Sequence, residues 1–128
     1  MKVFGSLAIS ALFLAGCANP YALMRDGNRA ALASVETGMS KSQVQNIIGT
    51  RSADGSSGKF ENPYKRETIR GTDSQSYDVL YFYTQQIDDK PIESGLSPVV
   101  FLEGKVVGIG WGFLDGLTGS STTTIRRR

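Results

Sequence analysis

Few residues in this chain have side chains that could do chemistry. There is no histidine, so imidazole catalysis and histidine-ligated metal sites are excluded. The only cysteine is Cys17, so neither an intrachain disulfide nor a cysteine cluster for zinc can form. A hydrolase without these groups needs a serine–lysine pair or two carboxylates. The candidates for such chemistry are the run Ser40-Lys41-Ser42 and the adjacent pair Asp88 and Asp89.

Neither candidate predicts a catalytic or metal site. The run from Ser40 is better explained as the start of a capped helix. Asp88 and Asp89 are adjacent in a loop, whereas a calcium site needs more oxygen ligands at alternating positions. No Gly-x-Gly-x-x-Gly segment follows a strand and opens a helix. We therefore expect no enzyme, no catalytic residue, no metal and no small-molecule substrate.

The charge balance argues against a nucleic-acid partner. Lys plus Arg is 14 and Asp plus Glu is 12, which is too even for a nucleic-acid-binding protein. Three of the basic residues form the terminal run 126–128. This run could attract anionic lipid headgroups or lipopolysaccharide, or it could be a solvated tail. With 128 residues, 40% of them hydrophobic and 20% charged, the composition is that of one globular domain.

The first 16 residues have the pattern of a secretory signal peptide. A basic start at Lys2 is followed by an apolar run over residues 7–14, broken only at Ser10, and then by small residues at Ala15 and Gly16. The apolar run is too short for a membrane-spanning helix, which needs roughly 20 residues. We expect this segment to be removed from the mature protein.

The end of the signal segment, Leu14-Ala15-Gly16-Cys17, resembles the lipobox of bacterial lipoproteins. In that class the cysteine sulfur receives a diacylglyceryl group, cleavage falls just before it, and its amine is then acylated. The resemblance implies a covalent lipid on Cys17 as membrane anchor, with no other cofactor. An Asp after the cysteine favours inner-membrane retention in that class, so Ala18 implies the outer membrane, with the domain facing the periplasm. The alternative is a secreted protein with an ordinary cleavage site and a free thiol.

Residues 38–50 are the segment with the clearest local signals, and they predict a short helix with a capping signal at each end. Ser40 can cap the first turn, and Gln43 can reach back to the amide of Ser40, which makes a capping box. Gly49 offers the backbone conformation that ends helices. The helix carries one narrow apolar stripe that must be buried, formed by Val44, Ile47 and Ile48.

A second short helix is expected before it, over residues 29–37 with Asn28 as its N-cap. We interpret residues 17–27 as a lipidated tether, 28–115 as the folded domain and 116–128 as a flexible tail. Because neither helix is long enough to be stable alone, both should lie on a sheet. The expected fold class is therefore α+β, with two short N-terminal helices packed on a three- to four-stranded antiparallel sheet.

The sequence of the rest of the domain predicts alternating loops and strands. Two segments read as loops, residues 51–62 and 86–98. Residues 64–70 are charged and predict an edge strand. Residues 77–85 predict a central strand, because one face carries Tyr77, Val79, Tyr81 and Tyr83 and the other carries Leu80 and Phe82.

The last hairpin is expected to join residues 99–102 to residues 105–114 through Glu103-Gly104. In that pairing Leu102 lies opposite Lys105, Phe101 opposite Val106 and Val100 opposite Val107. One face should cover the helix stripe with Val100, Leu102, Val107, Ile109, Trp111 and Phe113. The other continues as Gly108, Gly110 and Gly112, which is either a twisted strand filled by the protein's own chain or a shallow partner groove beside Phe101 and Tyr83.

The order of two helices and then strands behind a lipobox resembles the BamE-like (SmpA/OmlA domain) small outer-membrane lipoproteins. The residues that carry the resemblance are Gly38-Met39-Ser40-Lys41-Ser42-Gln43-Val44, then Ile48-Gly49-Thr50, Asn62-Pro63-Tyr64 and the hairpin over residues 100–107. The resemblance implies a non-enzymatic domain that binds proteins of the envelope, in outer-membrane assembly or envelope maintenance.

Two other functions stay open at this point. One is an enzyme-inhibitor-like binding domain, since a related arrangement of two helices and a sheet occurs in β-lactamase inhibitory proteins. The other is a lipid-binding or cell-wall-binding module that uses the aromatic residues and the arginine tail. The residues expected to contact a protein partner are Tyr81, Tyr83, Phe101, Gly108, Gly110 and Gly112.

Overall fold

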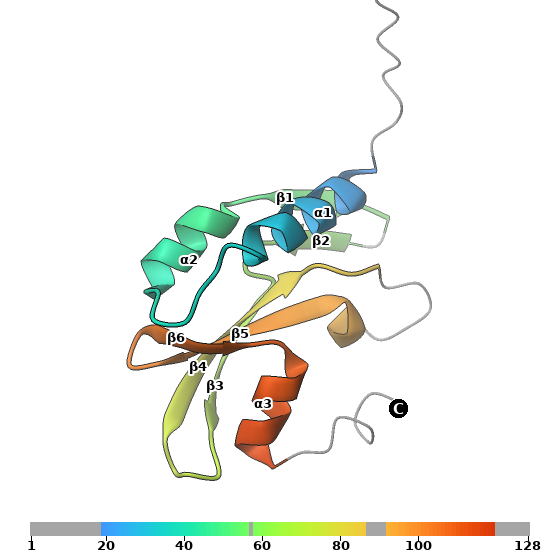
Figure 1. Ribbon diagram of the computed structural model, residues 1–128. Coiled ribbons are helices and arrows are strands. Elements are labelled where there is room, and N and C mark those ends of the chain that lie inside the picture. Colours follow the sequence, from blue (N-terminus) through green and yellow to red (C-terminus); the bar gives the residue numbers. More distant parts are fainter. Residues whose placement is uncertain (1–18, 57, 87–91, 120–128) are drawn as a thin grey trace, which may run out of the picture.

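The segment with four aromatic side chains forms the centre of the sheet. The computed structural model describes residues 19–56, 58–86 and 92–119. In it, β4 (Ser76–Tyr83) lies between β3 (Lys65–Arg70) and β5 (Leu96–Leu102), and β6 (Lys105–Ile109) follows β5 (Figure 1). All neighbouring pairs are antiparallel. The predicted edge strand and the predicted central strand are both confirmed, and the fold is α+β.

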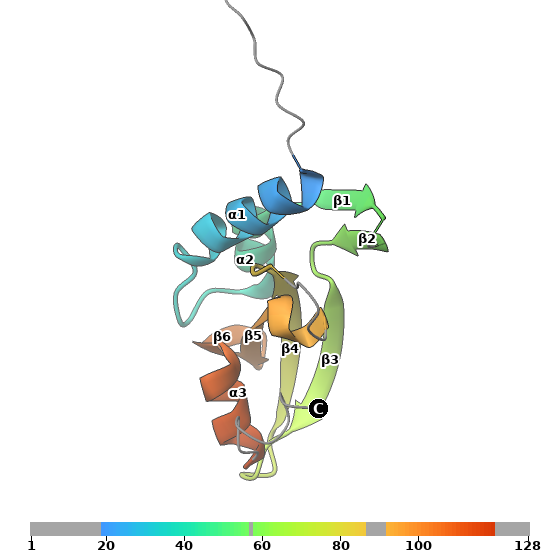
Figure 2. The ribbon, with the colours of Figure 1, turned by 90° about the vertical axis from the view of Figure 1, so that its right-hand side faces the viewer.

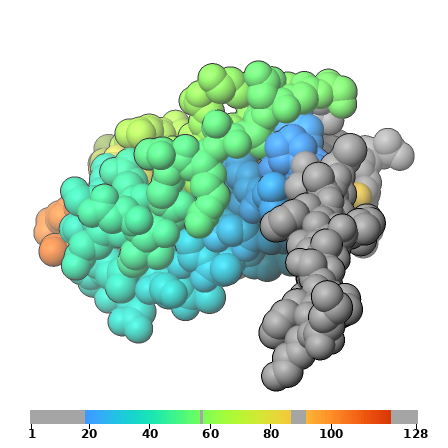
Figure 3. All heavy atoms as spheres, turned by 90° about the horizontal axis from the view of Figure 1, so that it is seen from above, coloured from blue at the N-terminus to red at the C-terminus, as the bar shows by residue number. Residues whose placement is uncertain are grey.

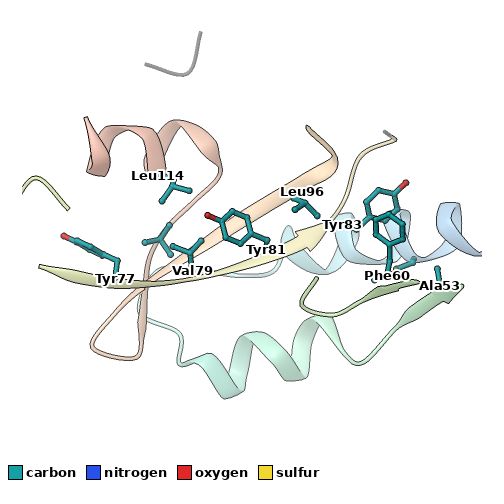
Figure 4. Close-up of a cluster of buried hydrophobic side chains, with 10 residues drawn as sticks. Ala53, Phe60, Tyr77, Val79, Tyr81, Tyr83, Leu96 and Leu114 are labelled. Carbon is teal, nitrogen blue, oxygen red and sulfur yellow. The ribbon is translucent and has the colours of Figure 1, made fainter. Parts of the chain in front are cut away.

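Both faces of β4 are buried, each in its own core. The first core contains Tyr77, Val79, Tyr81 and Tyr83 of β4, together with Met24, Ala53, Phe60, Leu96, Val100 and Leu114. Figure 4 shows Val79 and Tyr81 on the side of β4 that faces Leu114. The second core contains Leu80 and Phe82 of β4, together with Val35, Val44, Ile48, Val99, Phe101 and Val106. Period-two alternation therefore assigned both faces of this strand correctly.

The short capped helix forms as predicted and is α2 (Lys41–Ile48). Ser40 Oγ accepts from the Gln43 amide at 3.2 Å, and Gln43 Oε1 accepts from the Ser40 amide at 2.8 Å. Gly49 ends the helix with φ +77, a value that L side chains rarely adopt. Its stripe is buried in the second core. The prediction that this stripe faces Val107, Ile109 and Trp111 is wrong, because α2 covers the other face of the hairpin.

The first helix is longer than predicted and begins earlier. α1 spans Pro20–Leu32, and the side chain of Asn19 caps it by accepting from the Tyr21 amide at 3.0 Å. A start at Asn28 and an end at residue 37 are therefore wrong, and residues 20–27 belong to the folded domain. Proline at the first helical position after an asparagine cap is a standard helix start, so the signal was present in the sequence.

Residues 51–62 are a hairpin, so the prediction of a loop there is wrong. β1 (Ser52–Gly55) pairs with β2 (Gly58–Glu61), which places Ala53 opposite Phe60. These two side chains are the buried ones of the hairpin. Tyr21, Tyr64 and Tyr83 surround the ring of Phe60, with centroids 4.6 to 5.3 Å away. Aromatic contacts from distant segments thus stabilise strands that are too short to be recognised locally.

The second predicted loop ends earlier than expected. A 3₁₀ helix over Ile92–Gly95 leads directly into β5, which starts at Leu96 and includes Pro98. Proline is tolerated there because β6 pairs with β5 only as far as Val99 and Ile109. Pro98 still accepts a hydrogen bond from the Gly110 amide at 2.8 Å. Asp88 and Asp89 lie outside the described residues.

The segment 105–114, predicted to be one strand, forms a strand followed by the start of a helix. β6 ends at Ile109, and α3 spans Trp111–Thr118 after Gly110, whose φ is +94. A β-bulge places Val100 opposite Gly108, so the predicted pair of Val100 with Val107 is wrong. The other two predicted pairs, at Phe101 and Leu102, are confirmed. α3 covers the first core, where Leu114 is buried.

The glycine stripe expected along this strand does not exist. A Cβ at Gly108 would overlap the ring of Phe113, so the protein's own chain fills the space there. Gly110 and Gly112 have open space where a Cβ would point, and Gly112 lies within α3. α1 and the β1–β2 hairpin lie together at one end of the molecule, and α3 and the β3–β4 turn lie at the other (Figure 2).

Candidate functional site

The predicted lipid-attachment residues Leu14, Ala15, Gly16 and Cys17 lie outside the described residues, as does the arginine run 126–128. The described chain begins close to them, because only Ala18 and Asn19 separate Cys17 from the first residue of α1. Figure 3 views the end of the molecule where α1 begins, beside the β1–β2 hairpin. Leu23 in the first turns of α1 is 63% exposed, although sequence reasoning had not selected it.

The aromatic residues predicted to contact a partner are buried. Tyr81 and Tyr83 lie in the first core, and Phe101 lies in the second core on the opposite face of the sheet. The Tyr81 hydroxyl donates to Glu67 Oε1 at 2.9 Å, and burial together with this bond raises the pKa of Tyr81. Buried side chains on two faces do not form one contact surface, so the accessible surface of this sheet lies elsewhere.

A groove with a partly polar lining lies on the α2 side of the β3–β4 pair. Its volume is about 410 Å³, and it lies between the start of α2 and the two strands. Cross-strand pairing places Arg66 opposite Leu80 and Thr68 opposite Asp78. The lining is therefore both charged and apolar, and it includes Lys41, Arg66, Thr68, Asp78 and Leu80.

Asp78, an acid that lines this groove, already has an ion-pair partner. Asp78 Oδ2 accepts from Lys41 Nζ at 2.7 Å, and Asp78 Oδ1 accepts from Thr68 Oγ1 at 2.9 Å. The hydrogen bond from Lys41, and after it the bond from Thr68, holds the pKa of Asp78 below its ordinary value. The Lys41 ammonium also lies 5.8 Å from the centroid of the Phe101 ring. The negative charge of Asp78 is thus balanced within the domain.

Arg66 and Arg70 on β3 have charges that no acid of the described residues pairs with. Among the described residues the ion pairs are those of Arg25, Lys41, Lys59 and Lys65, so neither Arg66 nor Arg70 has an acidic partner. Both arginines are exposed. Arg66 and Arg70 are four residues apart on β3, with Thr68 midway between them, so all three side chains lie on one face of the strand. This face therefore presents uncompensated positive charge.

The two edges of the sheet differ. On β6, the Gly38 amide donates to the carbonyl of Val106, and the Val106 amide donates to the carbonyl of Met39, both at 2.8 Å. The start of that edge is therefore covered by the chain's own backbone. β3 pairs with β4 alone in the part of the chain that the structure describes. Its outer backbone amides and carbonyls are available to another strand.

The suspected serine–lysine run has structural roles. Ser40 Oγ accepts a helix-capping bond, and Lys41 forms an ion pair with Asp78. Within residues 19–56, 58–86 and 92–119, no group of three or more carboxylate or cysteine side chains is placed to hold a metal ion. In the same residues no helix is both long and apolar enough to cross a membrane.

Comparisons of this chain with protein-family models, with curated proteins and with solved structures each find no match.

Proposed function

We propose that this chain is a lipid-anchored envelope protein that acts by binding other proteins, without catalysis of its own, in outer-membrane assembly or envelope maintenance. The observation that supports it most is the open edge of β3 beside the groove at Lys41 and Asp78. An unpaired strand edge is a ready template for another chain, and folded proteins commonly use it for binding.

The anchor is proposed from the sequence pattern that ends at Cys17. Because one residue spans at most about 3.5 Å, α1 would begin within roughly 10 Å of the acylated sulfur. The tether is therefore much shorter than the sequence suggested, since residues 20–27 are helical. The α1 end of the domain would lie at the membrane surface, and the β3–β4 turn would point away from it (Figure 1).

The anchor can be tested by labelling cells with a radioactive fatty acid. We expect the wild-type protein to be labelled and Cys17→Ser to remain uncleaved and unlabelled. Ala18→Asp is the matched control, because it should be lipidated normally but shift the protein from the outer to the inner membrane. Labelled Cys17→Ser protein would refute the anchor.

The binding surface can be tested by photo-crosslinking in cells. A photoreactive amino acid is placed at Thr68 on β3, or at the exposed control positions Ser42 on α2 and Asp54 on β1. Crosslinks to envelope proteins from Thr68 alone would support the proposal. Crosslinks to one soluble enzyme would favour the inhibitor-like alternative, and crosslinks to lipid alone would favour the lipid-binding or cell-wall-binding module. Equal products from all three positions would contradict a specific surface at β3.

A further inference from the structure

We propose that β3 receives an extended segment of the partner as an added strand, and that this segment carries two carboxylates four residues apart, opposite Arg66 and Arg70. The inference rests on the proposed function, because it specifies the partner of the same edge. The partner is thus a protein chain with an acidic strand rather than a lipid or a nucleic acid.

The backbone of β3 provides the first half of the site. β3 is six residues long, which is an ordinary length for a strand. Its inner side is fully registered with β4, from Lys65 opposite Tyr81 to Arg70 opposite Ser76. Its outer amides and carbonyls have no partner among the described residues. An added strand would satisfy them and extend the sheet.

The two faces of β3 carry different charges. On the first-core face, Lys65 Nζ lies 3.0 Å from Glu67 Oε2 and 5.2 Å from the centroid of the Tyr81 ring, so the lysine is already paired. On the groove face, Arg66 and Arg70 form no ion pair with an acid of the described chain. Only the groove face therefore selects for the charge of an added strand.

Asp78 does not pair with either of these arginines. Asp78 lies opposite Thr68, between the two arginines along the strand, but Lys41 and Thr68 already occupy its two oxygens. Carboxylates of a partner directly opposite Arg66 and Arg70 would form the missing ion pairs.

The same charges disfavour a second copy of this chain as the occupant. In the antiparallel pairing centred on Thr68, Arg66 of one copy lies directly opposite Arg70 of the other. Like charges in that position destabilise a strand pair, whereas opposite charges stabilise it. Charged edges prevent self-association in many sheets, and here they also leave an acidic strand as the favoured partner.

The test uses the mature lipidated protein in nonionic detergent micelles and a labelled peptide, Thr-Val-Glu-Thr-Thr-Thr-Glu-Val-Thr, with binding followed by fluorescence anisotropy. One control peptide has Lys in place of both Glu residues. A second has its later Glu moved by one position, which sends that carboxylate to the other face. We expect binding of the first peptide, weakened by salt, and weaker binding of both controls. Equal binding of the three peptides, or no binding of the first, would overturn the inference.

Variants assign the contact to the two arginines. Arg66→Gln and Arg70→Gln should each weaken binding by about 2- to 5-fold, the range of one cross-strand ion pair. The double variant Lys59→Gln, Lys105→Gln removes two exposed charges elsewhere and is the control for net charge. If this control weakens binding as much as the double variant Arg66→Gln, Arg70→Gln, the effect is not local and the inference fails.

Backbone pairing is tested with N-methylated peptides. Methylation of the amides that would face β3 should abolish binding, and methylation of the alternate amides should leave it unchanged. Equal effects of the two methylation patterns would overturn strand addition. The two proposals can fail separately: crosslinks from Thr68 without peptide binding retain the protein-binding function and reject the acidic strand. Peptide binding without such crosslinks rejects the proposed function alone.

Discussion

Replacing Asn28 with alanine should strongly destabilise the domain. Its side chain is fully buried in the middle of α1. Asn28 Nδ2 donates to Asn62 Oδ1 at 2.8 Å and to the carbonyl of Tyr83 at 2.9 Å, and Asn28 Oδ1 accepts from Asn62 Nδ2 at 2.7 Å. These bonds join α1 to the residue directly after β2 and to the end of β4.

The expected loss can be worked from these contacts. Three hydrogen bonds at about 1 kcal/mol each give a loss of about 3 kcal/mol, and the unpaired groups left on Asn62 and Tyr83 add to it. For a domain of this size, that loss lowers the melting temperature by about 10 to 25 °C. Such a loss is a large part of the 5 to 15 kcal/mol of stability typical of a domain.

The assay is thermal and chemical unfolding followed by circular dichroism. Asn46→Ala is the matched control, because Asn46 is exposed on α2, and we expect it to change the melting temperature very little. Asn28→Asp should also be destabilising, because a carboxylate cannot donate to the Tyr83 carbonyl. In a double-mutant cycle, the effects of Asn28→Ala and Asn62→Ala should be less than additive. If Asn28→Ala and Asn46→Ala melt within about 3 °C of each other, the pair does not stabilise the fold in this way.

Three further results are expected. Gly108→Ala should cost about 1 to 3 kcal/mol in chemical unfolding, and adding Phe113→Ala should restore part of the loss, since the new methyl group overlaps that ring. Ser40→Ala should cost about 1 kcal/mol by the same measurement, because the capping bond is lost. The raised pKa of Tyr81 stabilises the fold below the unfolded pKa of about 10, and this contribution is lost as pH rises through the folded pKa. The pKa of Tyr77 is raised as well, by its hydrogen bond to Asp73. Ultraviolet titration should therefore show late-ionising tyrosine, and Tyr81→Phe should remove part of that late absorbance change.

Short-range patterns predicted the elements whose decisive contacts lie within a few residues. The capping box of Ser40 and Gln43 is an interaction between neighbours, and the structure confirms it. The alternation along β4 predicted a central strand because each face carries enough apolar area to be buried by itself. The charges of β3 predicted an edge in the same way.

The same reasoning failed where burial comes from distant segments. The β1–β2 hairpin has few apolar residues of its own, and Phe60 is buried by tyrosines from three other parts of the chain. Trp111 and Phe113 alternate as in a strand, yet they lie on α3, because Gly110 turns the chain and Leu114 then reaches the first core. Local periodicity over so short a segment does not distinguish a strand from a helix.

The amino-acid sequence alone excludes histidine chemistry, contains a single cysteine, and encodes the capped α2 and the strand pattern of an α+β fold. Tertiary structure decided which sheet face α2 covers, that Asn28 is a buried link rather than a helix cap, and that the expected aromatic contact residues are buried. It also decided which edge of the sheet is covered and which is open. The physical reason is that these properties depend on pairing between residues far apart in the chain, whereas caps and alternation depend on near neighbours.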